Sequence, residues 1–520
     1  MKRNTFNKCC LLVIIMALLA SGEAALSQQK TVITGRLSGA DRSLLPKAHV
    51  HLTRPNQSKP LSSVEVANDG TFKLTTGENG LLFVQFTGVN HLSHEVPLYV
   101  EKPVEVRLDV QLKPYEYVRD FSGVKIIGEF NNFSPQSARP MQKQPDGTYS
   151  AEFETSAEKF AYQLLGVTKS GNSVNGTLSE DYVYDGGGDY RSVVIPKNGR
   201  VKIVFDPKAL IKTDGAAHVR FADAHSRESR LAAVYDEMLK RRRSFSKAFA
   251  GYKSTGKPAY EFQYDWSNYL SDLSKEIAAE KDALIRQFLL FSYLDLGFGV
   301  YGAKLDAALT QKALEEVPPT SPLWNVEPDL IGVALRNAGQ PNKYSGYVQQ
   351  IIEGHPDQRV RNLAKKRYDP TRNIMVGKPV PAFSFASLDA QTTAYTNESL
   401  RSKVYLIDFW ATWCKPCIEE MENMHRVYEK YKRRGFEILS LSLDDKPETV
   451  IRFRGGKWKM PWLNAFVTGG FDSDVIKKFE ISGIPKPVLV DRQGRIIATE
   501  NDLRGPNLDK TLARVLGENK

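Results

Sequence analysis

Two cysteines three residues apart, Cys414 and Cys417, are the side chains of this sequence best suited to chemistry. Positions i and i+3 of a helix share one face, and their α-carbons are close enough for a disulfide. We expect a helix to begin at Cys414, where free N–H groups and the helix dipole favour a thiolate. Lys415 adds positive charge, and Pro416 suits a first helical turn. The pattern predicts thiol–disulfide exchange, in which Cys414 attacks and the deeper Cys417 resolves the mixed disulfide.

Three other interpretations of the cysteine pair are less consistent with the sequence. A zinc site needs two further ligands, but the other two cysteines lie within the first ten residues and His425 is the one histidine after His355. A static disulfide would close a very short loop and add little stability. Two unrelated buried thiols would not need a position between a strand and a helix. We therefore expect no metal and no cofactor other than the redox-active disulfide Cys414–Cys417.

The elements that must position this pair follow an alternating pattern over residues 377–520. The run VYLIDFWA is almost continuously apolar, as in a central strand covered on both faces. A strand–helix–strand start, a hairpin and a last helix are typical of a small mixed sheet with helices on its faces. We expect strands at 404–411 and 436–443, a hairpin at 487–498, and helices at 415–434 and 507–516.

This part of the sequence resembles the thioredoxin superfamily, specifically its exported TlpA/ResA-like thiol–disulfide oxidoreductases. The resemblance rests on DFWATWCKPC, on the lead-in GKPVPAFSFASLD and on GIPKPVLVDRQGRI. It implies an α/β thioredoxin-like domain over 373–520 that acts as a protein disulfide reductase. The upstream combination of β-sandwich and helical regions resembles that of large envelope TlpA-like proteins of Bacteroidetes.

The resemblance also implies roles for two carboxylates. Asp408 matches the family's buried carboxylate under the disulfide, where desolvation raises the pKa and lets the group accept the proton of the resolving thiol. A surface position at the sheet edge is the alternative, which its apolar neighbours disfavour. Glu420 matches an acid common three residues after the second cysteine. We expect it either to tune the site or to be an ordinary exposed helix residue.

Three residues are expected to contact a substrate peptide. Pro485 matches the family's cis-proline opposite the cysteines, and a cis Ile484–Pro485 bond is credible because cis bonds are rare except before proline. The resemblance implies that the backbone before Pro485 pairs with a substrate strand and that Trp413 shields the disulfide. Two positions depart from the family pattern. Lys486 replaces a common threonine, which predicts a more basic groove, and Glu422 replaces a helix proline, which predicts a straighter helix.

The first 27 residues have the pattern of a signal peptide. Three basic residues precede an apolar run at 9–20, which is too short to span a membrane, and small residues follow near 25–27. A retained anchor is the alternative. We expect residues 1–27 to be removed and the protein to be exported to the periplasm or cell envelope of a Gram-negative bacterium. Export would leave Cys414 and Cys417 as the chain's remaining cysteines.

Length and composition predict several domains between these two ends. A chain of 520 residues exceeds what one core supports, and its 25% of charged residues is that of a folded protein. Alternating apolar positions predict two all-β sandwiches. Residues 28–115, with AHVHL and DGTFKL, resemble the transthyretin-like carboxypeptidase regulatory domain. Residues 116–215, with VKIIGEFNNFS and DGTYSAEFE, resemble early-set immunoglobulin-like glycogen-binding modules.

Residues 216–372 have helical spacing, and we expect an α-helical region there. Its basic run Lys240–Arg243 is expected to be a solvated helix face rather than a nucleic-acid or membrane site. The second sandwich contains no tryptophan, so a spacer is a better interpretation than carbohydrate binding. The partners we expect are disulfide-containing client proteins and a membrane thiol donor, and we expect no nucleic acid.

Two rival functions remain open. A thiol peroxidase of the AhpC/TSA type needs proline and threonine before its reactive cysteine, where this chain has Ile407 and Ala411. A glycan- or partner-binding envelope protein with a relic thioredoxin domain would not need the intact cysteine pair. Reductase and oxidase use the same residues, and redox poise decides between them. The resemblance favours reduction.

Overall fold

The structure is a computed structural model that describes residues 30–57, 59–185, 189–210, 216–338, 341–389 and 394–517. The expected signal peptide, residues 1–27, lies outside the described residues. The chain divides into two compact units, Met1–Tyr235 and Asp236–Lys520. Within the described ranges, none of the helices has the length and apolar character needed to span a membrane.

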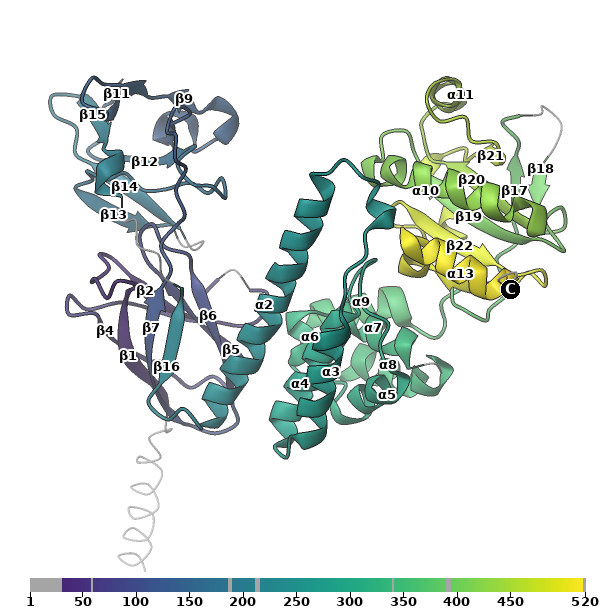
Figure 1. The fold of residues 1–520 in the computed structure, drawn as a ribbon, viewed down its shortest axis with the longest axis horizontal. Helices are drawn as coiled ribbons and strands as arrows, with labels where there is room; N and C mark the ends of the chain where they lie inside the picture. Colours follow the sequence, from purple (N-terminus) through teal and green to yellow (C-terminus); the bar gives the residue numbers. More distant parts are fainter. Residues whose placement is uncertain are drawn as a thin grey trace, which may run out of the picture. The chain divides into compact units, whose positions relative to one another are not determined.

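The first sandwich consists of two four-stranded sheets with the orders β16-β7-β1-β4 and β3-β2-β5-β6 (Figure 1). Alternate residues of each strand face the shared core, as Phe72 and Leu74 do in β4. The strands are β1 (Thr31–Gly39), β2 (His49–Thr53), β3 (Ser62–Glu65), β4 (Thr71–Thr76), β5 (Gly80–Thr87), β6 (His94–Val100), β7 (Glu105–Leu112) and β16 (His218–Phe221). β16 comes from the segment expected to be helical, and it pairs antiparallel with β7.

The second sandwich is antiparallel throughout, with sheets ordered β10-β11-β15 and β13-β14-β12-β8-β9. A turn at Asp146-Gly147 joins β10 to β11, and Gly147 has the positive φ of 91° that such a turn needs. The strands are β8 (Lys125–Gly128), β9 (Arg139–Pro140), β10 (Gln142–Lys143), β11 (Tyr149–Glu154), β12 (Phe160–Leu165), β13 (Asp181–Tyr184), β14 (Tyr190–Val194) and β15 (Arg200–Phe205).

A helical region follows, as its spacing predicts. Apolar positions three and four apart bury one face of most of these helices, and α4 is buried almost all round. The helices are α2 (Arg227–Lys253), α3 (Ser267–Ala279), α4 (Ala283–Leu296), α5 (Ala307–Glu316), α6 (Leu323–Val326), α7 (Leu330–Asn337), α8 (Ser345–Gly354) and α9 (Gln358–Tyr368).

The basic run of α2 is not the solvated face that its charge predicts. Arg241 is only 5% exposed, and its guanidinium donates to Ser292 Oγ at 3.0 Å. Arg242 binds the buried carboxylate of Asp295 through Nε and a second nitrogen, at 3.0 and 2.5 Å. Arg241 and Arg242 therefore join α2 to α4, because their long aliphatic stems pack on apolar surface while their guanidinium groups bind polar side chains of α4.

The last domain is a five-stranded sheet in the order β21-β20-β19-β22-β23, with a short ribbon of β17 and β18 beside it. β19, β20 and β21 are parallel, and β22 and β23 continue the sheet antiparallel. The strands are β17 (Ser384–Ala386), β18 (Ala394–Thr396), β19 (Val404–Trp410), β20 (Phe436–Ser442), β21 (Leu463–Phe466), β22 (Lys486–Val490) and β23 (Ile496–Thr499).

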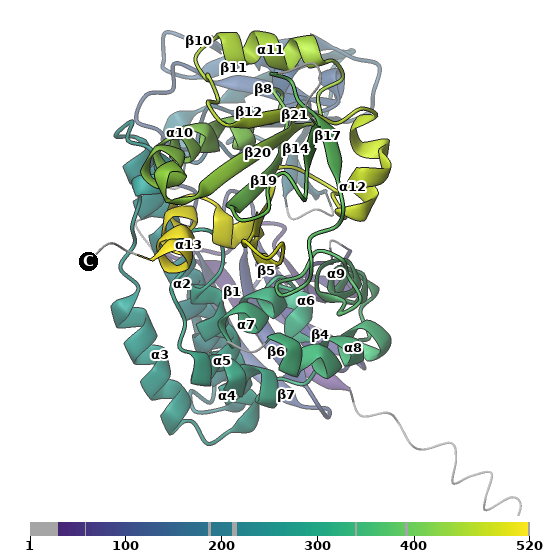
Figure 2. The same ribbon diagram turned by 90° about the vertical axis from the view of Figure 1, so that its right-hand side faces the viewer.

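Helices cover both faces of this sheet, which explains why every residue of β19 is buried. One face packs against α10 and α13, and the other against α12 and the segment before β19 (Figure 2). The helices are α10 (Lys415–Tyr431), α11 (Pro447–Gly455), α12 (Asp474–Lys478) and α13 (Pro506–Leu516), with short 3₁₀ turns at Lys432–Arg434 and Glu500–Leu503. These strands and helices form the α/β arrangement that the sequence predicts.

Asp295→Ala tests the link between α2 and α4. It removes the closer of two carboxylates that Arg242 faces, and we expect it to lower the free energy of unfolding by about 1–3 kcal/mol. Lys240→Ala breaks an exposed ion pair on the same helix and should change the free energy of unfolding by less than about 1 kcal/mol. Urea unfolding followed by circular dichroism measures both, and equal effects would contradict a structural role for the buried pair.

Candidate redox site

Cys414 and Cys417 form a disulfide at the N-terminus of α10. Their α-carbons are 5.2 Å apart, and both residues are buried. Cys414 is the N-cap of the helix, and its sulfur accepts a hydrogen bond from the backbone N–H of Cys417 at 3.3 Å. The helix therefore directs an N–H group at Cys414 Sγ, an arrangement that stabilises a thiolate in the reduced protein.

The residues around the cysteines lie at the surface. Lys415 and Pro416 are exposed in the first turn of α10. Trp413 is 61% exposed, and its ring centroid lies 6.5 Å from that of Phe471, itself 40% exposed. Two exposed aromatic rings thus lie together, one of them on the residue directly before Cys414. The sequence marks Trp413 through its neighbour Cys414, whereas nothing near Phe471 indicates a place beside the site.

Asp408 lies in β19 beneath the disulfide and is buried. It shares the α10 face of the sheet with Leu406 and Trp410, because alternate residues of a strand point the same way. Burial, and after it the negative charge of Glu420, raise the pKa of Asp408 to about 7, against the opposing positive charge of Arg504. Asp408 is therefore not at the surface edge of the sheet, which was the alternative to a buried position.

Glu420 faces inward from α10, and its carboxylate accepts two hydrogen bonds. Its Oε1 accepts from Asn423 Nδ2 at 2.5 Å and from the backbone N–H of Gly505 at 2.9 Å. Asn423 also donates to Gly505 O at 2.8 Å. Burial raises the pKa of Glu420, while these hydrogen bonds and Arg504 act in the opposite direction. Glu420 is therefore not an ordinary exposed helix residue.

A small space joins these groups to Cys417. Its volume is about 10 Å³, near the minimum for one water molecule. The residues that line it are Leu406, Asp408, Cys417, Glu420, Met424, Pro485, Pro487, Leu503 and Arg504. Asp408, Glu420 and Cys417 therefore border one cavity, which suits proton transfer directly or through a single water.

The Ile484–Pro485 peptide bond is cis, as the resemblance predicts. Pro485 borders the same cavity as Cys417, and β22 begins directly after it. The antiparallel register of β22 sets Pro487 opposite Asp408 in β19. The proline loop and the buried carboxylate are thus placed by one pair of strands.

Of the two expectations about the departures from the family pattern, the basic groove at Lys486 is wrong and the straighter helix at Glu422 stays a prediction. Lys486 forms an ion pair with Glu500, and its side chain is only 16% exposed. The expected basic groove is therefore not formed by Lys486, because its charge is balanced within the domain. Glu422 is exposed on α10, which is one continuous helix from Lys415 to Tyr431.

Sequence reasoning missed the residues that surround the carboxylates. Arg504, Asn423 and Gly505 come from α10 and from the junction before α13. Arg504 Nε is buried with no hydrogen-bond partner among the described residues, and the charge of Arg504 acts on both acids. No spacing in the sequence connects Arg504 to Asp408. Arg504 acts on Asp408 because the fold brings the segment before α13 close to β19.

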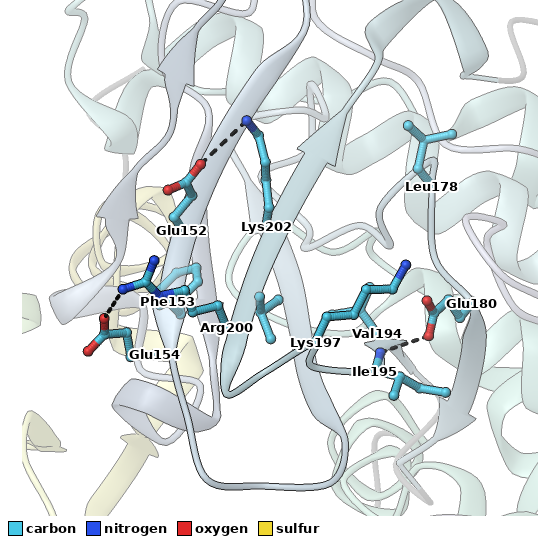
Figure 3. Close-up of a pocket in the computed structure, with 11 residues that line it drawn as sticks. Glu152, Phe153, Glu154, Leu178, Glu180, Val194, Ile195, Lys197, Arg200 and Lys202 are labelled. Carbon is cyan, nitrogen blue, oxygen red and sulfur yellow. Dashed lines mark hydrogen bonds and ion pairs between the residues drawn. The ribbon is translucent and has the colours of Figure 1, made fainter.

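A second cavity lies in the second sandwich, the region that resembles glycogen-binding modules. It measures about 780 Å³ and opens between β11, β15 and the segment before β13 (Figure 3). Four of the charged side chains on its wall form two ion pairs, Glu152 with Lys202 and Glu154 with Arg200 (Figure 3). The aromatic residue in its lining, Phe153, is buried. This cavity offers no exposed ring on which a sugar could stack.

Comparison with known proteins concerns the last domain. Residues 402–496 match a family model described as thioredoxin-like. The thiol-disulfide oxidoreductase ResA of Bacillus cereus is 29% identical over 149 residues, which are 29% of this chain and 81% of that protein. ResA of Bacillus thuringiensis is 29% identical over 141 residues, 27% of this chain and 76% of that protein. Among solved structures, the thioredoxin domain of a thiol-disulfide oxidoreductase from Bacteroides vulgatus is 27% identical, with a TM-score of 0.26, and covers 28% of this chain and 99% of that one.

The last domain is therefore thioredoxin-like. Its ResA-like relatives place it, within that family, among the thiol–disulfide oxidoreductases. The alignments with these relatives span under a third of the chain, which continues upstream into the two sandwiches and the helical region.

The pH dependence of stability tests the burial of Asp408. Because its pKa is raised from 3.8 to about 7 on folding, the carboxylate destabilises the folded protein progressively as the pH rises through this range. Asp408→Asn should therefore stabilise the oxidised protein by about 2–4 kcal/mol more at pH 8 than at pH 4. Urea unfolding at both pH values measures the difference. The exposed Asp445→Asn is the control, and equal gains at both pH values for Asp408→Asn would contradict the raised pKa.

Proposed function

We propose that this chain is an exported protein disulfide reductase that donates two electrons from the Cys414/Cys417 dithiol to disulfides of client proteins. The observation that carries the proposal is the place of the pair: at a helix N-terminus, bordering one cavity with Asp408, Glu420 and the cis Pro485. Export to the periplasm or cell envelope of a Gram-negative bacterium rests on the pattern of residues 1–27.

The reaction begins with the reduced chain. The Cys414 thiolate attacks one sulfur of a client disulfide, so that a Cys414–client bond forms and the other client sulfur leaves as a thiolate. Cys417 then gives its proton to Asp408 and attacks Cys414 Sγ. The second client sulfur leaves, and the chain holds the Cys414–Cys417 disulfide. Two electrons have moved to the client, whose thiolates take up protons, and a membrane thiol donor returns the chain to the dithiol.

The client is held beside the disulfide by backbone and ring contacts. Ile484 lies just before β22 and is half-buried, which suits its backbone to pairing with an extended client segment. Trp413 and Phe471 supply apolar surface next to Cys414. Lys415 and Pro416, exposed in the same turn, adjust the electrostatics and shape of this face.

Single cysteine variants test the proposed order of events. With insulin as client and dithiothreitol as electron source, Cys414→Ser should lose at least about 100-fold of the reductase rate, because the nucleophile is gone. Cys417→Ser should accumulate a mixed disulfide with the client, visible on a non-reducing gel. Glu422→Ala, exposed on the same helix, should leave the rate unchanged. A mixed disulfide trapped through Cys417 in Cys414→Ser would reverse the assigned roles, and no reduction by the unaltered chain would support a relic domain.

The same assay addresses the peroxidase alternative. Ile407 and Ala411 are fully buried and apolar, so neither side chain can polarise a peroxide at the positions where that class uses proline and threonine. Hydrogen peroxide turnover should therefore be far slower than insulin reduction. Equal rates with the two substrates would favour the peroxidase.

The reduction potential of the full chain tests the direction of electron flow. A reductase needs a potential near the roughly −270 mV of thioredoxin, whereas a strong oxidant such as DsbA lies near about −120 mV. Equilibration with glutathione or dithiothreitol buffers, followed by thiol alkylation, measures it. We expect the reducing value, and a potential near −120 mV would replace the reductase by an oxidase.

A further inference from the structure

The helical region contacts the last domain close to the buried carboxylates. The loop between α4 and α5 approaches the segment that leads into α13, where Asn507 Nδ2 donates to Val300 O at 3.0 Å. A β-carbon on Gly505 would lie 2.8 Å from Val300 Cγ1 and 3.8 Å from the Tyr301 hydroxyl. Gly505 also has a positive φ of 53°. The two segments come this close because residue 505 has no side chain.

The same glycine holds Glu420. Its backbone N–H donates to Glu420 Oε1, and its carbonyl accepts from Asn423, which binds that same carboxylate oxygen. Burial and then the charge of Glu420 raise the pKa of Tyr301 to about 12, so this phenol of the helical region lies within the field of the site. The position of Glu420 thus depends on a backbone segment that the loop packs against.

The loop itself is anchored within the helical region. Trp266 Nε1 donates to Tyr301 O at 2.9 Å. The Tyr301 ring lies 5.0 Å from the ring of Phe249 and 5.5 Å from that of Phe262, between centroids. Arg426 of α10 also lies over the ring of Tyr260, at 5.1 Å from the centroid. A packed aromatic cluster therefore faces the outer side of α10 and the start of α13.

We propose that Val300 and Tyr301 of the helical region are positioning residues for the redox site: by seating Gly505 and Asn507, they hold the Glu420 carboxylate next to Asp408 and Cys417. The inference rests on the proposed thiol chemistry and adds a role for the helical region. A carboxylate held beside a thiol disfavours the thiolate, so its fixed position sets how readily the dithiol ionises. The helical region would then tune the reactivity of the pair without touching the client.

Thiol titration of the reduced full-length chain tests the proposal. Iodoacetamide reaction rates and ultraviolet thiolate absorbance, measured against pH, give the apparent thiol pKa values, which belong to the coupled pair. Glu420→Gln should lower the apparent value, because a negative charge is removed. Asn507→Ala should lower it too, and a shift of half a pKa unit is about a 3-fold gain in thiolate below the pKa. In the double variant, Asn507→Ala should add nothing to Glu420→Gln, because both act through one carboxylate.

Variants on the helical side complete the test. Tyr301→Ala should shift the titration as Asn507→Ala does, whereas Tyr301→Phe keeps the ring and should match the unaltered chain. Phe298→Ala is the control, since Phe298 belongs to the same loop but is exposed. If Tyr301→Ala does not fold, the titration of the half-buried variant Asn507→Ala still tests the proposal.

The proposal would be overturned by an unshifted titration in Asn507→Ala, by a shift that adds fully to that of Glu420→Gln, or by an equal shift in Phe298→Ala. Absence of any shift in Glu420→Gln would also overturn it. Insulin reduction is measured separately on the same proteins. A chain that titrates as expected but reduces no client would defeat the proposed function and leave the positioning role standing.

Discussion

A carboxylate carried into a protein interior loses its hydration, which costs several kcal/mol unless other groups take the place of water. The last domain carries two, Asp408 and Glu420, beneath one disulfide. Glu420 is held by hydrogen bonds from Asn423 and Gly505, and the charge of Arg504 acts on both acids. Asp408 keeps a raised pKa, so the burial that costs stability also makes it a proton acceptor near neutral pH.

This arrangement explains why so many separate segments meet at the site. β19 supplies Asp408, α10 supplies the cysteines and Glu420, and β22 begins at the cis-proline. The junction before α13 supplies Arg504 and Gly505. Each segment is placed by sheet register or helix packing before it contributes a polar group, which keeps those groups in fixed positions as the thiols react.

The upstream regions differ in what they add to the last domain. The second sandwich keeps the architecture that its motifs predict, yet its large cavity has paired charges and a buried phenylalanine instead of exposed rings. The helical region instead reaches the redox site through Val300 and Tyr301. Within the basic run Lys240–Arg243 of α2, Arg241 and Arg242 bind side chains of α4.

Local patterns predicted much of this protein. The cysteine spacing, the apolar strand before it and the hairpin after it were sufficient to predict β19, α10, β20, the β22–β23 hairpin and α13 within a few residues at each end. The sequence analysis did not predict α11, β21 and α12, which lie between β20 and β22. A site made by residues close in sequence can be predicted from such patterns, because the helix and strand periods determine which of those residues share a face. The cis Ile484–Pro485 bond followed from resemblance rather than from spacing.

The sequence by itself determined that a reactive cysteine pair stands at a helix N-terminus behind a central strand. Only the tertiary structure decided the electrostatics around it. Arg504 meets Asp408 from nearly a hundred residues away, Lys486 is balanced by Glu500, and Gly505 lies between Glu420 and the helical region. Desolvation and charge pairing depend on distances through space, and no local period in a sequence encodes them.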